Sequence, residues 1–449
     1  MRASPRPLPS TGAITGVLEA LAFFRDADFA RARFERFGDV FATKLVGQPL
    51  VFIRGERAIT DLLSQPEATE GWWPESVRQL LGSRSLANRN GADHRARRRV
   101  VGQLFSAAAL RRYTPAIMQL VEELAADLNG ATEPVALVER MRRFAFAVIA
   151  SVVLGLEGDD IEALFADFEI WTRALFSVPV ALPGSPFARA LQARARLLER
   201  LRGVLERAQE RPTGGLDLLS GGLDEAGLPL TDDDLVEQLL LLLFAGYETT
   251  ASSLSCLMRA LLLHPEVESW LREELETLPW PPDPEMAAGA YDPQRAPRLD
   301  ALVQEVLRLT PPVGGFFRRT TRPLTLAGVA VPPGRVVQVA LAASNRYAPG
   351  LAAGAGDADD WAALDLESFR PQRHLEGAIS ATLLPFGGGE RVCLGKALAE
   401  LEIRLMVVGL MRRLHLELAP GQDLELQLLP SPTPRDGLLV QALEPPAAA

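Results

Sequence analysis

Near the C-terminus the chain reads Phe386-Gly387-Gly388-Gly389-Glu390-Arg391-Val392-Cys393-Leu394-Gly395. Cys393 is one of only two cysteines, and the glycines on either side let the backbone curl closely around whatever the sulfur binds. A metal-thiolate loop is one interpretation, and a small buried apolar residue in a glycine-rich turn is the other. A segment that fixes these residue types at these spacings arises by chance on the order of once in 10,000 chains of this composition, which favours the metal-thiolate loop.

The loop resembles, position for position, the haem-binding loop of the cytochrome P-450 family, F-x-x-G-x-R-x-C-x-G. The likeness continues through residues 396–402, where the family's helix begins beneath the haem. A thiolate ligand donates electron density to haem iron and favours O–O cleavage, whereas an imidazole ligand gives globin or peroxidase chemistry. The resemblance therefore implies haem b with Cys393 as the metal ligand. It also implies that Phe386 and Gly395 belong to the cofactor-binding residues and that Arg391 binds a propionate.

A long helix is predicted before the loop. Thr231 is followed by three aspartates, which is a strong helix start because a capping hydroxyl and acidic side chains both favour the N-terminus. We expect this helix to continue to Leu263, which precedes His264-Pro265, over roughly 50 Å at 1.5 Å per residue. Its apolar run, residues 235–246, contains a glutamate and a glutamine and is too short to cross a bilayer.

Inside this predicted helix lies the segment Ala-Gly-Tyr-Glu-Thr-Thr, residues 245–250. It resembles the family's oxygen-activating pattern, [AG]-G-x-[DE]-T-[TS]. The resemblance implies that Ala245 and Gly246 let the backbone approach the bound oxygen. It also implies that Glu248 and Thr249 relay protons to dioxygen. Alone, such a segment inside a helix is more often structural.

A strongly basic helix is predicted just before residue 100. His94 and Arg98 are four residues apart and share one helix face, where the family places two propionate-binding side chains. A run of charges is usually a solvated face, and both interpretations hold if Arg95, Arg97 and Arg99 point elsewhere. Because the chain is acidic overall, this basic cluster is where we expect a ferredoxin or flavodoxin, with its reductase, to dock as electron donor.

An E-x-x-R element is formed by Glu305 and Arg308. The spacing alone signals nothing, because Glu139 to Arg142 and Glu199 to Arg202, among others, show the same spacing. This copy is followed by two prolines and by an F-x-P-x-R-like element that ends at Arg373. The resemblance implies a buried ion network of Glu305, Arg308 and Arg373, which would fix one arrangement of the haem-side core. Arg318 aligns with a propionate-binding arginine, and the adjacent Arg319 leaves that choice open.

Apolar side chains occur where the family lines its substrate pocket. The two tryptophans among them either line the pocket or simply pack in the core. A break rich in Pro at residues 176–184 resembles the lid over the substrate channel. Residues 175–179, 244–252, 312–318 and 386–389 resemble the branch with retinoic-acid hydroxylases and their cyanobacterial relatives, so we expect an elongated retinoid, terpenoid or fatty acid. The pocket candidates are Trp72, Trp73, Phe176, Phe244, Val313, Phe316, Phe317 and Pro434.

Composition and charge limit the class of protein and its cellular location. A formal net charge of −10 over 449 residues argues against a general nucleic-acid binder. Two cysteines cannot form a disulfide framework, so a reducing cytosol fits best. The N-terminus lacks an apolar core of signal-peptide length. We therefore expect a cytoplasmic protein without a membrane span, as in the soluble bacterial type.

The fold implied by the resemblance is mainly α with a minor β portion, the cytochrome P-450 fold. We expect a single catalytic domain over residues 1–449, with a small β lobe at roughly 30–70 plus 320–345 and a helical haem-binding lobe. Its implied activity inserts one oxygen atom from dioxygen into a lipophilic substrate. Three alternatives stay open: a peroxide-driven peroxygenase, which typically lacks the acid–threonine pair, a non-catalytic haem-thiolate sensor, and a structural cysteine site without haem.

Overall fold

The computed structural model describes residues 4–12, 16–25, 29–45, 47–175, 177, 179–210, 214–282, 291–347, 365–377, 379 and 384–443. The chain divides into two compact units. The first, called the sheet unit here, comprises Met1–Trp72 and Ala301–Cys393. The second, the helical unit, comprises Trp73–Asp300 and Leu394–Ala449. The chain thus passes between units directly after Trp72, again inside helix α12, Pro297–Leu309, and a third time directly after Cys393.

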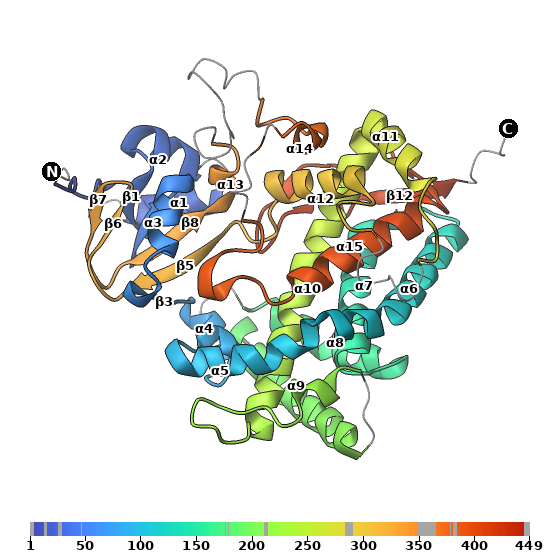
Figure 1. The fold of residues 1–449 in the computed structure, drawn as a ribbon, viewed down its shortest axis with the longest axis horizontal. Coiled ribbons are helices and arrows are strands. Elements are labelled where there is room, and N and C mark those ends of the chain that lie inside the picture. The colour runs from blue at the N-terminus through green and yellow to red at the C-terminus, as the bar shows by residue number, and fades with distance from the viewer. Residues whose placement is uncertain are drawn as a thin grey trace. The chain divides into compact units, whose positions relative to one another are not determined.

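The sheet unit is built on a five-stranded sheet with the order β1-β2-β8-β5-β3 (Figure 1). Only the β2–β8 pair is parallel. A separate hairpin pairs β6 with β7. The strands are β1 Val40–Leu45, β2 Gln48–Ile53, β3 Thr69–Gly71, β5 Gly315–Thr320, β6 Leu324–Leu326, β7 Val329–Val331 and β8 Val336–Ala340. The helices are α1 Gly16–Arg25, α2 Phe29–Phe37, α3 Glu56–Leu63, α13 Leu341–Ser344 and α14 Gln372–Leu375, with short 3-10 turns at Pro66–Ala68 and Gly389–Arg391.

The sheet is covered on both faces because successive apolar residues along a strand point to opposite faces of the sheet. On β2, Val51 and Ile53 pack into one buried cluster, while Leu50 and Phe52 pack into another. The tight connection between β1 and β2 contains Gly47, whose φ of +82° suits a residue without a Cβ. Strands β1 and β2 lie in one of the segments expected to contain β structure, 30–70, and β6, β7 and β8 lie in the other, 320–345.

The helical unit contains the longer helices, and its strands are short. One three-stranded sheet has the order β4-β12-β9, and β10 pairs with β11. The helices are α4 Glu75–Leu81, α5 Gly91–Gly102, α6 Ala107–Gly130, α7 Leu137–Val152, α8 Asp159–Thr172, α9 Pro186–Glu210, α10 Asp232–Leu263, α11 Pro265–Leu275 and α15 Lys396–Met411. The strands are β4 Val135–Ala136, β9 His415–Leu418, β10 Leu426–Gln427, β11 Thr433–Pro434 and β12 Leu439–Leu443, and short 3-10 turns lie at Leu86–Asn88, Gln103–Phe105 and Leu216–Leu219.

Helix α10 is the central element of the helical unit and packs against α7, α9, α11 and α15 (Figure 1). The Thr231 hydroxyl accepts a hydrogen bond from the Asp234 N–H at 3.2 Å, which caps the first turn. The helix ends at Leu263, as the sequence predicts. By length and composition α10 is apolar enough to cross a membrane, but 67% of its most apolar window is buried inside the structure. Such burial is typical of a core helix in a globular protein.

Candidate functional site

The predicted thiolate loop, residues 386–395, includes the last residues of the sheet unit in the sequence, which ends at Cys393. Gly387 and Gly389 have φ angles of +71° and +67°, so the turn uses a backbone conformation that side chains with a Cβ disfavour. The turn closes where the Cys393 N–H donates to the Phe386 carbonyl at 2.9 Å. The Cys393 side chain is exposed. The loop therefore leaves the Cys393 side chain accessible on a backbone that is already curled.

Two guanidinium groups belong to this region: that of Arg391 in the loop itself and that of Arg318 on β5. Gly71 leaves room for the Arg391 guanidinium, because a Cβ at Gly71 would lie 2.4 Å from the Arg391 Cζ. Burial and the nearby charge of Arg391 lower the pKa of Arg318 to about 10, although Glu390 opposes the shift. A largely desolvated cation next to a second cation favours an anionic ligand. Arg319 instead forms an ion pair with Glu70 at 3.6 Å, so Arg318 is the arginine at the loop.

The residues of the loop fit a haem group. An accessible cysteine side chain is the ligand that haem-thiolate iron requires. The anion-binding character of Arg318 and Arg391 matches the carboxylates that haem carries as propionates. The sheet unit thus carries a thiol and two guanidinium groups whose chemistry suits haem iron and its propionates.

The E-x-x-R element forms a buried ion network in the sheet unit. Glu305 accepts from Arg308 at 2.8 and 2.9 Å and from Arg373 at 3.0 Å, and the His374 ring lies 2.9 Å away. The three charged side chains are at most 1% exposed. Burial alone raises the pKa of Glu305, but the hydrogen bonds from Arg308 and His374, the charge of Arg308 and the Arg370 N–H lower it to about 2. The carboxylate is therefore ionised across the physiological range.

The segment Ala-Gly-Tyr-Glu-Thr-Thr, residues 245–250, lies in the middle of α10. The Thr249 hydroxyl donates to the Ala245 carbonyl at 2.6 Å. Burial raises the pKa of Glu248, and the charge of Arg142 on α7 partly opposes that shift. Gly246 has a packing role of its own, because a Cβ there would lie 2.5 Å from the Ile149 side chain of α7. A carboxyl whose pKa is raised and a hydroxyl one residue later are groups that can hold and pass a proton.

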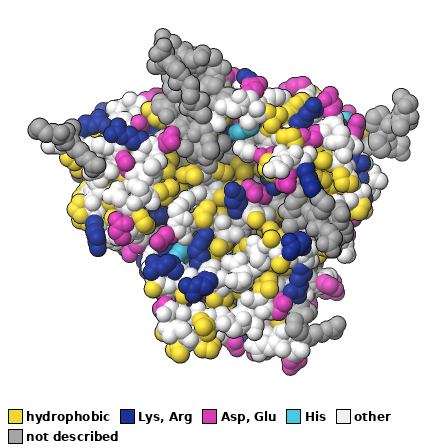
Figure 2. Space-filling view, in the orientation of Figure 1, with side chains coloured by type: hydrophobic (Ala, Val, Ile, Leu, Met, Phe, Trp, Pro, Cys, Tyr) yellow, Lys and Arg dark blue, Asp and Glu magenta, His cyan; other side chains and the backbone are white. Residues whose placement is uncertain are grey.

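Helix α5 carries the predicted propionate ligands. His94 is buried and Arg98 is half-buried on the same helix face, one turn apart. Arg97 corrects the predicted docking cluster, because it is only 5% exposed. Its guanidinium binds Asp234 at 3.1 Å and Glu225 at 2.9 Å, which removes it from the surface. Arg95 and Arg99 are exposed, and Figure 2 shows basic side chains gathered over the region of α5.

The predicted pocket residues are distributed over both units. Phe316 and Phe317 are neighbours on β5 and pack against different core clusters. Because they point to opposite faces of the sheet, at most one of them can face a given pocket. Trp72 is half-buried with its ring 5.3 Å from that of Phe317, which is a core contact. Phe244 on α10 packs against Trp171, with ring centroids 5.9 Å apart.

The remaining pocket candidates differ in exposure. Val313 is 43% exposed, Trp73 is half-buried and Pro434 is buried in β11. Phe176 lies outside the described residues. Gly395, predicted beside the thiolate, is half-buried at the start of α15.

One polar residue of the core escaped the sequence analysis. Glu402 on α15 is 1% exposed, and its Oε1 accepts from the Thr250 hydroxyl of α10 at 2.9 Å. Burial raises its pKa to about 8, while the hydrogen bond from Thr250 opposes the shift. Its sequence signal was an acidic residue flanked by Leu401 and Ile403 in a mostly apolar helix. The side chain joins α15 to the residue that directly follows Thr249.

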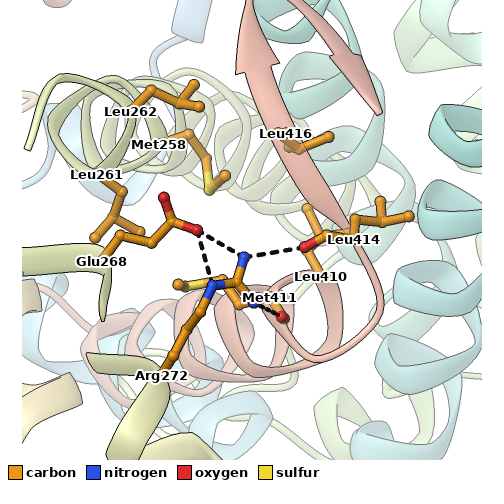
Figure 3. Close-up of a pocket in the computed structure, with 9 residues that line it drawn as sticks. All are labelled: Met258, Leu261, Leu262, Glu268, Arg272, Leu410, Met411, Leu414 and Leu416. Atoms are coloured by element: carbon orange, nitrogen blue, oxygen red, sulfur yellow. Dashed lines mark hydrogen bonds and ion pairs between the residues drawn. The ribbon is translucent and has the colours of Figure 1, made fainter. Parts of the chain in front are cut away.

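A small cavity in the helical unit is not a substrate pocket. It holds ≈ 20 Å³, about the space of a single water. Figure 3 shows Arg272 beside it, reaching from Glu268 to the carbonyls of Met411 and Leu414 at the end of α15. The cavity is therefore a packing gap around a clamp between α11 and α15.

Comparisons with known proteins agree with this arrangement. A sequence model of the family described as Cytochrome P450 matches residues 5–442. Cytochrome P450 120 of Synechocystis sp. is 35% identical over 433 residues, covering 94% of this chain and 94% of that protein. Cytochrome P450 26B1 of Danio rerio is 33% identical over 434 residues, covering 93% of this chain and 83% of that protein.

A solved structure extends the likeness to three dimensions. A cyanobacterial CYP120A1 with retinoic acid bound has a TM-score of 0.86 and 34% sequence identity, covering 98% of this chain and 100% of that chain. Together with the family match, this confirms the predicted mainly helical fold with a minor β portion and the predicted family.

Proposed function

Because this chain belongs to the cytochrome P450 family of haem monooxygenases, we propose that it hydroxylates an elongated lipophilic acid of the retinoid class. One observation carries the choice of substrate: the similar cyanobacterial structure holds retinoic acid. The half-buried aromatic side chains Trp73 and Phe244 are suited to a flat apolar molecule. Terpenoids and fatty acids are the competing substrates, and they serve as comparison ligands in the test.

The proposed roles of the residues follow from their chemistry. Haem supplies the oxygen-activating chemistry when Cys393 holds its iron. We assign Arg318, Arg391, His94 and Arg98 to the propionates. The carboxyl of Glu248, whose pKa is raised by burial, holds a proton that the Thr249 hydroxyl can pass on.

The substrate proposal is tested by titrating the purified haem protein with all-trans-retinoic acid, farnesol and palmitic acid. We expect retinoic acid to shift the haem absorption band at the lowest concentration. Turnover with a surrogate ferredoxin and reductase should then give a product heavier by one oxygen atom. A protein whose band shifts only with compact polar ligands would contradict the proposal.

Two other haem-thiolate activities are separated by a second test. The acid–threonine pair at Glu248 and Thr249 supports dioxygen chemistry over a peroxide-driven reaction. A reduced carbon-monoxide difference spectrum reports a thiolate-bound iron, and C393S should abolish it. Turnover with peroxide but never with donated electrons would favour a peroxygenase. Absence of turnover with either would favour a sensor.

We further propose that the electron donor is a separate ferredoxin or flavodoxin in the cytoplasm, and that the whole chain acts as one catalytic domain. Exposed Arg95 and Arg99 on α5 support docking of an acidic donor. Arg97 takes no part, because it is buried in ion pairs.

A further inference from the structure

The edge of the five-stranded sheet carries a strand position without a side chain. Strand β3 lies at this edge beside β5, and the register of the pair places Gly71 opposite Arg318 (Figure 1). Side chains of residues directly opposite one another in an antiparallel pair leave the same face of the sheet, with Cβ atoms about 5 Å apart. A side chain at position 71 would therefore stand beside the Arg318 side chain.

The Arg391 guanidinium occupies that place. A Cβ at Gly71 would lie 2.4 Å from the Arg391 Cζ and 2.6 and 2.7 Å from its two terminal nitrogens. The cysteine-bearing loop also contacts Arg318, whose Nη2 donates to the Gly388 carbonyl at 3.4 Å while its guanidinium lies 4.8 Å from the centre of the Phe316 ring. Two guanidinium groups thus share one face at the edge of the sheet.

The register that creates this arrangement is fixed by contacts on the other face. Glu70 forms an ion pair with Arg319 at 3.6 Å, and the Trp72 ring packs against that of Phe317 with centroids 5.3 Å apart. These contacts flank Gly71 on both sides in the sequence. A slip of one residue would turn the Glu70 or the Trp72 side chain toward the space that the second guanidinium fills.

Two cations that share one face repel each other, and an anion bound between them relieves the repulsion. The pKa of Arg318 reports this proximity, because burial and then the charge of Arg391 lower it, although Glu390 opposes the shift. Guanidinium groups bind carboxylates through charge-assisted hydrogen bonds, so a pair of them suits a ligand that carries carboxylates.

We propose that Gly71 is a positioning residue for the cofactor, whose missing side chain lets Arg391 lie beside Arg318 so that both guanidinium groups serve the haem carboxylates. The inference rests on the proposed function, which assigns these two arginines to the propionates. Because Gly71 lies in a paired strand, an alanine there adds only the Cβ, and the flexible Arg391 side chain must move to admit it. G71A therefore displaces a guanidinium while it keeps the strand.

The test measures how firmly the holoenzyme holds its cofactor. Transfer of haem to excess apomyoglobin is followed at the haem absorption band for wild type, G71A and G314A. For G71A we expect transfer on the order of tenfold faster, because charge-assisted contacts to a carboxylate are weakened. Gly314 is the matched control, since it is exposed in the same unit and a Cβ there would meet no atom within 4 Å. G314A should keep the wild-type rate, and all three proteins should keep the carbon-monoxide difference spectrum of thiolate-bound iron.

A second measurement separates positioning from a general loss of stability. Wild type and G71A are reconstituted with haem dimethyl ester, in which the two carboxylates are replaced by uncharged esters. We expect the ester to leave both proteins at similar rates, because it offers no anion to the guanidinium pair. A merely structural defect in G71A would instead speed the loss of haem and of its ester alike, and that result would overturn the inference.

A double variant asks whether the alanine acts through Arg391. Adding G71A to R391M should not change the rate of haem transfer, because the guanidinium that the alanine displaces is already gone. The inference is overturned if G71A releases haem at the wild-type rate, if G314A is as fast as G71A, or if G71A accelerates release from R391M. A wild-type protein that binds no haem contradicts the proposed function itself, and this inference with it. If G71A is isolated without haem, R391M and G71A/R391M decide the question by the same comparison.

Discussion

At the scale of single residues, Glu402 couples the stability of the helical unit to pH. Burial raises the pKa of this carboxyl from its ordinary 4.5 to about 8, although the Thr250 hydroxyl opposes the shift. The folded protein therefore holds a proton between these two pH values that the unfolded chain releases. This stabilisation is fully present below pH 4.5 and is lost as the pH rises toward 8.

We expect E402Q to remove this pH dependence. The amide stays uncharged and can still accept the hydrogen bond from Thr250. The free energy of unfolding should fall with pH in wild type more steeply than in E402Q, by up to about 1.4 kcal/mol per pH unit between pH 5 and 8. Urea denaturation at several pH values measures the difference, with E417Q at an exposed strand position as control. Parallel curves for wild type and E402Q would refute the assignment.

Glu305 gives the opposite case, a buried carboxyl kept ionised by its partners. E305Q leaves Arg308 and Arg373 buried without their counter-charge, so we expect the free energy of unfolding to fall by about 3–5 kcal/mol. E376Q is the matched control, because it removes an exposed ion pair with neighbouring Arg370 and should cost below about 1 kcal/mol. Chemical denaturation of both variants at pH 7 compares them. Equal losses would mean that the buried network contributes no more than a surface pair.

Some of the site residues could be predicted from short sequence motifs, whereas others depend on contacts that form only in the folded chain. The thiolate loop and the Glu305 element were predictable because short motifs fix their chemistry. Arg97 was misplaced because a basic run on a helix favours a solvated face, while its partner Asp234 lies 137 residues away in the chain. Phe316 and Phe317 could have been separated from sequence alone, since adjacent strand residues face opposite sides.

At the scale of elements, the ends of helices are fixed by specific hydrogen bonds. Both ends of α10 were predictable, because its cap and its terminating proline are local signals. The clamp between α11 and α15 was not, because its contacts are formed only in the folded chain. Arg272 of α11 donates to the Met411 and Leu414 carbonyls at the end of α15, and Arg412 donates to the Leu275 and Leu278 carbonyls at the end of α11. Each helix thus receives a cation at its negative end.

We expect R272M to loosen this clamp. The variant keeps an apolar stem against the cavity of Figure 3 but leaves two carbonyls and Glu268 without their donor. The free energy of unfolding should fall by about 1–3 kcal/mol. R435M, which removes a mostly exposed arginine paired with Asp423 and Glu425, should change it by under about 1 kcal/mol. Denaturation curves that shift equally for both variants would show that the clamp adds nothing beyond a surface ion pair.

At the scale of the whole molecule, the net charge is −10, and Arg95 and Arg99 of α5 are exposed cations on this acidic chain. An acidic electron donor is repelled by most of such a surface and attracted by a local basic region, so encounter should depend on a few cations. Arg95 and Arg99 remain candidates, whereas buried Arg97 does not. The relevant quantity is the rate of first reduction and its response to salt.

We therefore expect the R95E/R99E variant to be reduced by a ferredoxin about tenfold more slowly at low ionic strength, with a weaker dependence of the rate on salt. R189E/R200E makes the same change of charge at exposed positions on α9 and should leave the rate close to wild type. Stopped-flow reduction under carbon monoxide measures all three proteins. If both double variants slow reduction equally, net charge alone explains the effect. If neither does, the donor docks elsewhere, because a contact that steers an acidic partner cannot be reversed in sign without cost.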